Sequence, residues 1–172
     1  MNRLEELALV ARVLAVDDRR AFARLVDAHQ QALLRFLTAM CGDEVEAADI
    51  AQETFIKAWR GLRGWQQSGR FATWLYAIAI NECRSAMRSR REYSSELPDE
   101  AADSTEAPAD ARMDLATAVE SLSEPQREVV LLFYYRDMAL KNIVKVTGMP
   151  ENTVKSHLMR ARTRLRAILD EK

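Results

Sequence analysis

Reactive and metal-binding residue types are scarce in this sequence. Its 172 residues include two cysteines, Cys41 and Cys83, and two histidines, His29 and His157. None of the four has partners at the spacing of a zinc site, so we expect buried thiols and, at His29, a structural or surface side chain. Glycine-rich phosphate loops and nucleophile motifs are also missing. We therefore predict a protein that is not an enzyme, holds no metal or cofactor and has no small-molecule substrate.

Glycine, proline and long hydrophobic runs are scarce as well. Five glycines and four prolines punctuate the chain, and nearly every segment has apolar residues at helical spacing, which predicts an all-α protein. No run approaches the roughly 20 apolar residues that span a bilayer. The first residues carry Glu5 and Glu6, whereas a signal peptide has a basic start. We expect a cytoplasmic protein without membrane insertion.

The formal net charge of -1 hides an uneven distribution of charge. Residues 92–114 carry eight acidic side chains and one basic side chain, Arg112, together with Pro98 and Pro108. An acidic stretch with scarcely an apolar anchor is typical of a flexible linker. The predicted parts are therefore a helical domain over residues 1–92, an acidic linker over 93–113 and a second helical domain over 114–172.

Periodicity and capping residues place four helices in the first domain. They are expected over residues 3–15, from a cap at Asp17 or Asp18 to about Cys41, over 44–62 and over 73–91. The third helix has a wide apolar face that we expect in the core. This face consists of Ala48, Ala51, Phe55, Ala58, Trp59 and Leu62.

The opposite face of the third helix is an acidic and amide stripe with one isoleucine. The stripe consists of Asp49, Gln52, Glu53, Ile56 and Arg60. Such a stripe is either a solvated surface or a docking surface for a basic helical partner, with Ile56 as the apolar anchor. Periodicity does not distinguish the two.

The loop at residues 61–73 interleaves aromatic, cationic and polar side chains. Its candidate binding residues are Arg63, Trp65, Ser68, Arg70 and Phe71. Aromatic rings stack on unpaired bases for roughly 1–3 kcal/mol per base, and guanidinium groups hold the backbone, so the loop suits single-stranded DNA. It equally suits a helix connection with Trp65 and Phe71 in the core. The following helix carries one line of polar and cationic groups that can track a phosphate backbone. This line consists of Asn81, Arg84, Arg88 and Arg91.

The second domain is expected to end in a helix-turn-helix. Helices over residues 115–122 and 124–138 come first, and the latter supplies the core residues Val129, Val130, Leu132, Phe133 and Tyr134. A helix at about 140–147 is then stopped by Gly148 and Pro150. In the next helix, one face carries the apolar stripe Val154, Leu158, Ala161 and Leu165. The other face is polar and basic, as in a solvated helix or a helix laid in the major groove of DNA.

Four segments, in this order, resemble the extracytoplasmic-function sigma factors, the small initiation subunits of bacterial RNA polymerase. They are DIAQETFIKAW at residues 49–59, RFATWLYAIAINECRSAMR at 70–88, SLSEPQREVVLL at 121–132 and GMPENTVKSHLMRARTRL at 148–165. The resemblance covers nearly the whole chain. It implies a sigma region 2-like helical bundle, a flexible acidic linker and a sigma region 4-like helix-turn-helix domain.

The resemblance also implies partners and a role for each candidate site. The stripe of Asp49, Gln52, Glu53, Ile56 and Arg60 would bind the clamp coiled coil of the largest polymerase subunit, and the flap of the second subunit is a further expected contact. The minus-10 promoter element would be melted and held by Arg63, Trp65, Ser68, Arg70, Phe71, Asn81, Arg84 and Arg88. The minus-35 element would be read as duplex by Asn152, Thr153, Lys155, Ser156, His157, Arg160, Arg162 and Arg164. An anti-sigma factor is the expected regulator.

Four positions depart from the pattern of this family. Asn142 and Val144 replace the first and last residues of a triplet that is usually Glu-Ile-Ala. His157 stands where arginine is common, and Ile80, before Asn81, stands where arginine is again common. Promoter sequence is therefore not transferable from the resemblance. A free-standing helix-turn-helix repressor or activator is the alternative, and the stripe on the third helix argues against it because a repressor has no need of such a surface.

Overall fold

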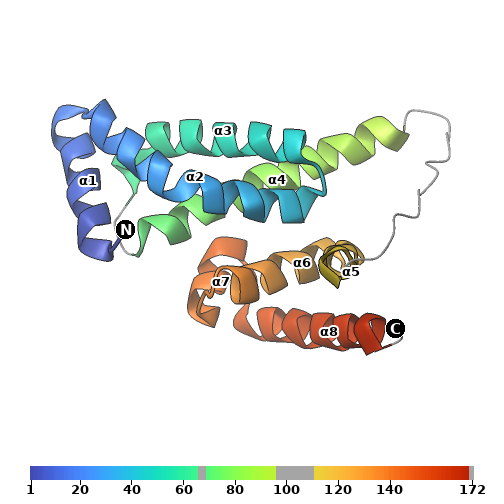
Figure 1. Cartoon of the computed structure of the whole chain (residues 1–172). Coiled ribbons are helices and arrows are strands. Elements are labelled where there is room, and N and C mark those ends of the chain that lie inside the picture. The colour runs from blue at the N-terminus through green and yellow to red at the C-terminus, as the bar shows by residue number, and fades with distance from the viewer. Residues whose placement is uncertain (66–68, 96–110, 171–172) are drawn as a thin grey trace.

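The structure is a computed structural model, and it describes residues 1–65, 69–95 and 111–170. Its regular elements in these ranges are all helical, as expected (Figure 1). The first half contains α1 (Arg3–Val16), α2 (Arg19–Cys41), α3 (Glu44–Gly61), the short 3₁₀ helix η1 (Leu62–Gly64) and α4 (Phe71–Ser95). The second half contains α5 (Ala111–Glu120), α6 (Glu124–Val130), the wide turn η2 (Leu131–Tyr135), α7 (Leu140–Thr147) and α8 (Glu151–Asp170).

Short polar side chains begin the first three helices. The Asn2 side chain accepts a hydrogen bond from the Glu5 backbone amide. The Glu5 side chain in turn accepts one from the Asn2 backbone amide, and the two bonds form a capping box. Of the two expected caps for α2, the structure uses Asp18, whose Oδ1 accepts from the Ala21 amide at 3.0 Å. Asp17 instead ends α1 in the left-handed conformation, with φ at 55°. Gly42 takes the same conformation after α2, where glycine carries no steric penalty.

Three helices have bounds that differ clearly from the sequence-based expectation. Helix α4 runs two residues earlier and four later than residues 73–91, and α5 begins at Ala111 rather than at 115. The expected linker therefore loses a few residues at each end to helix, and residues 96–110 lie outside the described part. Helix α6 stops at Val130 and gives way to η2, in which the Arg136 amide donates to the Leu131 carbonyl at 3.1 Å.

The wide turn η2 corrects one core prediction. Val129, Val130 and Leu132 are buried as expected, but the Tyr134 side chain is 54% exposed. The α-helix ends at Val130, and the wider turn after it does not continue the apolar stripe of α6. Tyr134, near the end of this turn, therefore points to solvent.

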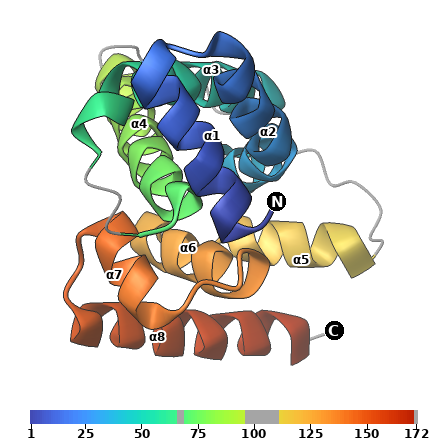
Figure 2. The same ribbon diagram turned by 90° about the vertical axis from the view of Figure 1, so that its left-hand side faces the viewer.

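The first half is a bundle in which α1 crosses one end of α2 and α4 lies against α2 and α3 (Figures 1 and 2). His29 of α2 and Glu6 of α1 are both buried, and His29 Nε2 lies 3.0 Å from Glu6 Oε1. The imidazole also packs at 5.5 Å from the ring of Phe71. His29 is thus a structural side chain that joins α1, α2 and α4, as its lack of ligand partners had indicated.

The two halves pack directly against each other, which the sequence does not predict. Helices α2 and α4 meet α6 and α7 (Figure 2). The buried apolar residues of both halves form one continuous cluster. In the second half α7 and α8 form the expected helix-turn-helix about Gly148, and Val154, Leu158 and Ala161 lie in its core. None of the helices in the described part combines the length and hydropathy needed to cross a bilayer.

Candidate functional site

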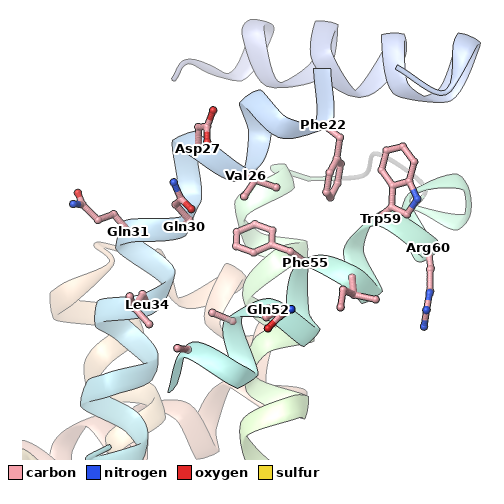
Figure 3. A pocket seen from close by; sticks show the side chains of 13 residues that line it. Phe22, Val26, Asp27, Gln30, Gln31, Leu34, Gln52, Phe55, Trp59 and Arg60 are labelled. Carbon is pink, nitrogen blue, oxygen red and sulfur yellow. The ribbon is translucent and has the colours of Figure 1, made fainter. Parts of the chain in front are cut away.

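A groove of about 1080 Å³ runs between α2 and α3 (Figure 3). Its apolar surface includes Phe22 and Trp59, whose rings meet edge to face at 4.9 Å. Polar side chains also line it, both from α2 and from α3. The lining residues are Phe22, Val26, Asp27, Gln30, Gln31, Leu34, Ala48, Ala51, Gln52, Phe55, Ile56, Trp59 and Arg60. An apolar floor with amides and charges of both signs suits an amphipathic helix from a partner.

The groove corrects the predicted core face of α3. Ala48 is exposed and Phe55 and Trp59 are half-buried, so these three line the groove and do not fill the interior. The buried face consists of Ala47, Ile50, Ala51, Thr54 and Ala58. Helix α3 packs on α2 and α4 together, which turns its inward arc toward Ile50. A threonine is tolerated there because its hydroxyl donates to the Ile50 carbonyl at 2.7 Å.

The predicted stripe on α3 divides between the groove and its surroundings. Gln52, Ile56 and Arg60 line the groove, whereas Asp49 and Glu53 lie outside its lining. Sequence reasoning missed the facing side, which α2 supplies. It consists of Asp27, Gln30, Gln31 and Leu34. Their spacing of i, i+3, i+4 and i+7 marks one helix face, and the 38% exposure of Leu34 makes it an apolar side chain on an otherwise polar face.

A second, smaller hollow lies where η1 meets α4. Trp65 stacks on Trp74 with ring centroids 5.6 Å apart and an interplanar angle of 20°. Both rings line a hollow of about 430 Å³ that also contains Asn81. Phe71, by contrast, is 1% exposed and meets Trp65 edge to face at 5.9 Å. The alternative left open by the sequence holds for Phe71, which is a core residue that supports Trp65.

The remaining DNA-binding candidates of the loop are Arg63, Arg70 and Ser68. Arg63 and Arg70 are exposed, and Arg63 Nη2 lies 3.5 Å from Asp17 Oδ1. Ser68 lies outside the described residues. Trp74 was not predicted as a candidate. The Trp74 indole packs beside Gly61, where a Cβ would meet the ring at 3.4 Å.

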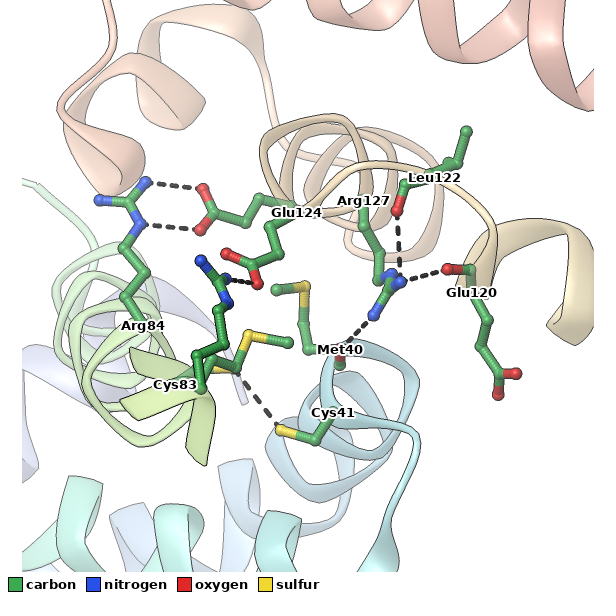
Figure 4. Close-up of polar contacts among 11 residues, drawn as sticks. Met40, Cys41, Cys83, Arg84, Glu120, Leu122, Glu124 and Arg127 are labelled. Atoms are coloured by element: carbon green, nitrogen blue, oxygen red, sulfur yellow. Dashed lines mark hydrogen bonds and ion pairs between the residues drawn. The ribbon is translucent and has the colours of Figure 1, made fainter. Parts of the chain in front are cut away.

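The cationic line of α4 is partly occupied by the second half (Figure 4). Arg84 donates from Nε and Nη2 to the two carboxylate oxygens of Glu128, at 2.7 and 2.6 Å, and from Nη2 to the Thr147 carbonyl at 3.1 Å. Glu128 is only 2% exposed, and its hydrogen bonds raise the pKa of Arg84. Arg91 pairs with Glu124, while Arg88 remains exposed beside them. The Arg84–Glu128 pair is bidentate, which fixes orientation as well as charge.

Two arginines of the second half complete the contact. Arg127 Nη1 donates to the Met40 carbonyl at 2.7 Å, and the same guanidinium reaches the carbonyls of Glu120 and Leu122 (Figure 4). It also donates to the Val119 carbonyl at 3.2 Å. The Met40 carbonyl belongs to the last turn of α2, which lacks partners within its helix. The Arg136 guanidinium lies 4.9 Å from the ring centre of Tyr76, and burial raises the pKa of Tyr76 to about 12.

Helix α8 presents most of its predicted contact residues to solvent. Asn152, Lys155, Arg160, Arg162 and Arg164 are exposed, while Thr153, Ser156 and His157 are half-buried. Lys155 pairs with Glu151 one turn earlier at 2.6 Å. Arg162 is held by Tyr134, which accepts from its Nε and lies 5.3 Å beneath its guanidinium. Among the described residues, no group of three or more His, Cys, Asp and Glu side chains is placed to hold a metal ion.

Both halves of the chain resemble parts of known proteins. Residues 25–93 match the family model described as Sigma-70 region 2, and residues 112–165 match that described as Sigma-70, region 4. The chain is 32% identical over 162 residues to the RNA polymerase sigma-H factor of Pseudomonas aeruginosa, with 84% of each sequence covered. It is 33% identical over 155 residues to the ECF RNA polymerase sigma factor SigL of Mycobacterium tuberculosis, with 86% of this chain and 88% of the relative covered.

Two solved structures resemble the whole arrangement. One is CnrH, a sigma factor of Cupriavidus metallidurans, in complex with the cytosolic domain of CnrY, with a TM-score of 0.75 and 28% identity over 98% of this chain and 99% of that chain. The other is RpoE in complex with the anti-sigma factor NepR from Bartonella quintana, with a TM-score of 0.74 and 25% identity over 87% and 96%. The first likeness includes both halves of this molecule in one superposition.

Proposed function

The chain belongs to the sigma-70 family of RNA polymerase sigma factors, in its extracytoplasmic-function group, and from this premise we propose that it binds core polymerase in the cytoplasm and directs promoter-specific initiation. One observation carries this proposal: regions 2 and 4 follow each other in a chain that is matched over 98% of its length by the sigma factor CnrH. The family consists of initiation factors rather than enzymes, so the catalysis of RNA synthesis belongs to the polymerase.

The groove between α2 and α3 is the docking surface for core polymerase. The groove supplies what a coiled-coil partner needs, which is an apolar floor for its buried side chains and a polar rim for its flanks. Gln52, Ile56 and Arg60 lie in the groove, and the nearby carboxylates of Asp49 and Glu53 attract a basic helix. The α2 residues Asp27, Gln30, Gln31 and Leu34 extend the surface beyond the stripe proposed from sequence.

The minus-10 element is opened at the hollow beside η1. Trp65, backed by Trp74 and Phe71, offers a ring face to an unstacked base, and Asn81 in the same hollow offers hydrogen bonds. The cations on and around α4 contribute phosphate contacts. They are Arg63, Arg70, Arg84 and Arg88.

The minus-35 element is read by α8 as duplex DNA. The helix begins directly after the turn at Gly148, so its N-terminal polar residues lead into the major groove. Asn152, Thr153, Ser156 and Arg160 suit base edges, whereas Lys155, Arg162 and Arg164 suit phosphates. His157 is half-buried on the same helix and adds a further polar contact.

An anti-sigma factor is the regulatory partner. Two solved relatives with whole-chain likeness are described as complexes, one with the cytosolic domain of CnrY and one with the anti-sigma factor NepR. In the structure the two halves pack against each other, and we call this the closed arrangement. In it, Arg84 is held by Glu128 and Thr147 and so is not available to DNA. A partner that binds both halves would stabilise that arrangement by its differential affinity for it.

Reconstituted transcription tests the proposal. Purified chain is added to core polymerase, and run-off products are measured from genomic promoter fragments. Specific initiation is expected with the chain and not without it. Tight duplex binding without polymerase, combined with no gain in initiation, would favour a free-standing helix-turn-helix repressor or activator.

Substitutions in the groove test the docking surface separately. Ile56→Asp and the double variant Asp49→Lys with Glu53→Lys are expected to weaken core binding at least tenfold, since they remove the apolar anchor and reverse the charge. Asp170→Lys, an exposed acid at the end of α8, serves as the control. Unchanged polymerase affinity in both Ile56→Asp and the double variant would contradict the assignment of the groove.

A further inference from the structure

The two cysteines, 42 positions apart in the sequence, meet in the core. Cys41 is the last residue of α2 and Cys83 lies within α4, and their sulfur atoms are 3.5 Å apart (Figure 4). Both thiols are free and buried, with residue exposures of 7% for Cys41 and 0% for Cys83. The sequence predicted burial but not contact. A pair of facing thiols is chemically different from two separate ones, because each is a reaction partner for the other.

The surroundings make the two thiols unequal. The hydrogen bond with Cys83 lowers the pKa of Cys41, and the charges of Arg90 and Arg127 act in the same direction. The contact with Cys41 and burial both raise the pKa of Cys83, which also touches the Met87 sulfur at 3.9 Å. Cys41 is thus the more exposed and more nucleophilic thiol, and Cys83 is placed to react second.

We propose that Cys41 and Cys83 form an oxidation site, in which a hydroperoxide converts the two thiols to a reversible intramolecular disulfide. The Cys41 thiolate attacks the peroxide O–O bond and becomes a sulfenic acid while the leaving oxygen departs as water or an alcohol. The Cys83 sulfur then displaces the sulfenic oxygen as water and forms the S–S bond. The two thiols lose two electrons and two protons, and the peroxide accepts both.

The disulfide forms directly beneath the contact between the two halves. Met40, next to Cys41, accepts from Arg127, and Arg84, next to Cys83, binds Glu128. Forming the bond shortens the sulfur separation from 3.5 Å to about 2.0 Å. Arg127 and Glu128 are neighbours on α6. Helix α6 therefore sets the distance between the groups that they bind, the Met40 carbonyl on α2 and the Arg84 guanidinium on α4. Drawing the end of α2 toward α4 therefore strains the closed contact.

Formation of the Cys41–Cys83 disulfide and packing of the two halves against each other consequently oppose each other. A disulfide that strains the closed contact weakens it, and by linkage the closed contact resists disulfide formation by the same factor. Gly42, left-handed directly after Cys41, ends α2 at this thiol. This inference concerns the chain alone and does not rest on its binding to polymerase or DNA.

Oxidation of the full chain with hydrogen peroxide tests the site. We expect one intramolecular disulfide, seen as a mass loss of about 2 Da relative to the reduced chain, loss of both reactive thiols and a Cys41–Cys83 cross-linked peptide. Dithiothreitol should restore both thiols. Cys83→Ala is expected to leave a sulfenic acid on Cys41 that dimedone traps, whereas Cys41→Ala is expected to leave Cys83 largely reduced. Disulfide dimers, or sulfinic acid on Cys41 with Cys83 still reduced in the wild type, would overturn the proposal even if the variants fail to fold.

A redox titration tests the opposition between oxidation and closure. In glutathione buffers of defined ratio, Glu128→Ala is expected to raise the equilibrium constant for disulfide formation about fivefold or more over the wild type, since it removes the Arg84 contact. Asp170→Ala, at an exposed site away from this contact, should leave the constant unchanged. An equal constant in Glu128→Ala and the wild type would show that disulfide formation and closure are independent.

Discussion

Helices α4 and α8 each carry a line of cationic side chains, yet the two lines face different surroundings. The line on α4 meets the acidic residues of α6, where Glu124 and Glu128 hold Arg91 and Arg84. Among the described residues, the cations on α8 contact groups of their own half, such as Glu151 and Tyr134. The same residue pattern therefore acts as an interdomain contact in one helix and as an open surface in the other. We infer that duplex reading by α8 is compatible with the closed arrangement, whereas full use of α4 requires the halves to separate.

Breaking the Arg84 contact should produce the largest effect. Arg84→Glu sets a carboxylate against the buried Glu128, and breaking a pair of which one partner is buried costs at most about 3–5 kcal/mol. The halves should separate, which small-angle scattering would detect as a larger radius of gyration. Arg88→Glu, on the same face but exposed, is the matched control. Compact scattering from Arg84→Glu would mean that apolar packing alone holds the halves together.

Tyr76, on α4 beside Arg136, should lower the free energy of unfolding as the pH rises above 10. Burial raises the pKa of Tyr76 to about 12, above its ordinary value of 10. Its contribution is therefore fully present below pH 10 and is lost as pH rises toward 12, by up to about 2–3 kcal/mol. Chemical denaturation across this pH range should show a smaller decline in Tyr76→Phe than in the wild type. Tyr93→Phe, at an exposed tyrosine, should follow the wild type.

The hollow at Trp65 provides an intermediate test, since all of its lining comes from the first half. Trp65→Ala should weaken binding of a single-stranded minus-10 oligonucleotide by about 1–3 kcal/mol through lost stacking. Fluorescence anisotropy measures this directly. Trp59→Ala removes a tryptophan from the α2–α3 groove instead and should bind the oligonucleotide normally. Equal losses in both variants would point to general destabilisation of the bundle.

The smallest effect is expected on α8. Lys155→Ala should lower the slope of log binding constant against log salt by about one unit on a minus-35 duplex, because one phosphate contact is lost. Arg84→Glu should leave this slope unchanged if α8 is open in both arrangements. A changed slope in Arg84→Glu would break the contrast between the two helices.

Most helices could be predicted from the sequence, because capping residues and apolar periodicity act over a few neighbouring residues. Asp18, Gly148 and the stripe at Val154 and Leu158 are examples. The prediction failed where a helix has more than one neighbour. The arc of α3 that becomes buried depends on both α2 and α4, so Phe55 was assigned to the core when it lines a groove.

Contacts between distant segments were also beyond sequence reasoning. Nothing local in the chain marks Glu128 as the partner of Arg84 or places Cys41 beside Cys83. The candidate contact residues were chosen by residue type and spacing, which identify the chemistry of a face but not what covers it. The burial of Phe71 shows the same limit, because an aromatic residue after a loop suits both a core and a stacking surface.

The four carbonyl acceptors of Arg127 have a kinetic consequence. Three of them, on Val119, Glu120 and Leu122, belong to the second half, and only the Met40 carbonyl lies across the contact. When the halves part, the guanidinium keeps its place at the end of α5 and loses one bond of the set. It remains poised for the next encounter. On return to the closed form, Arg127 therefore needs little side-chain search before it binds the Met40 carbonyl again.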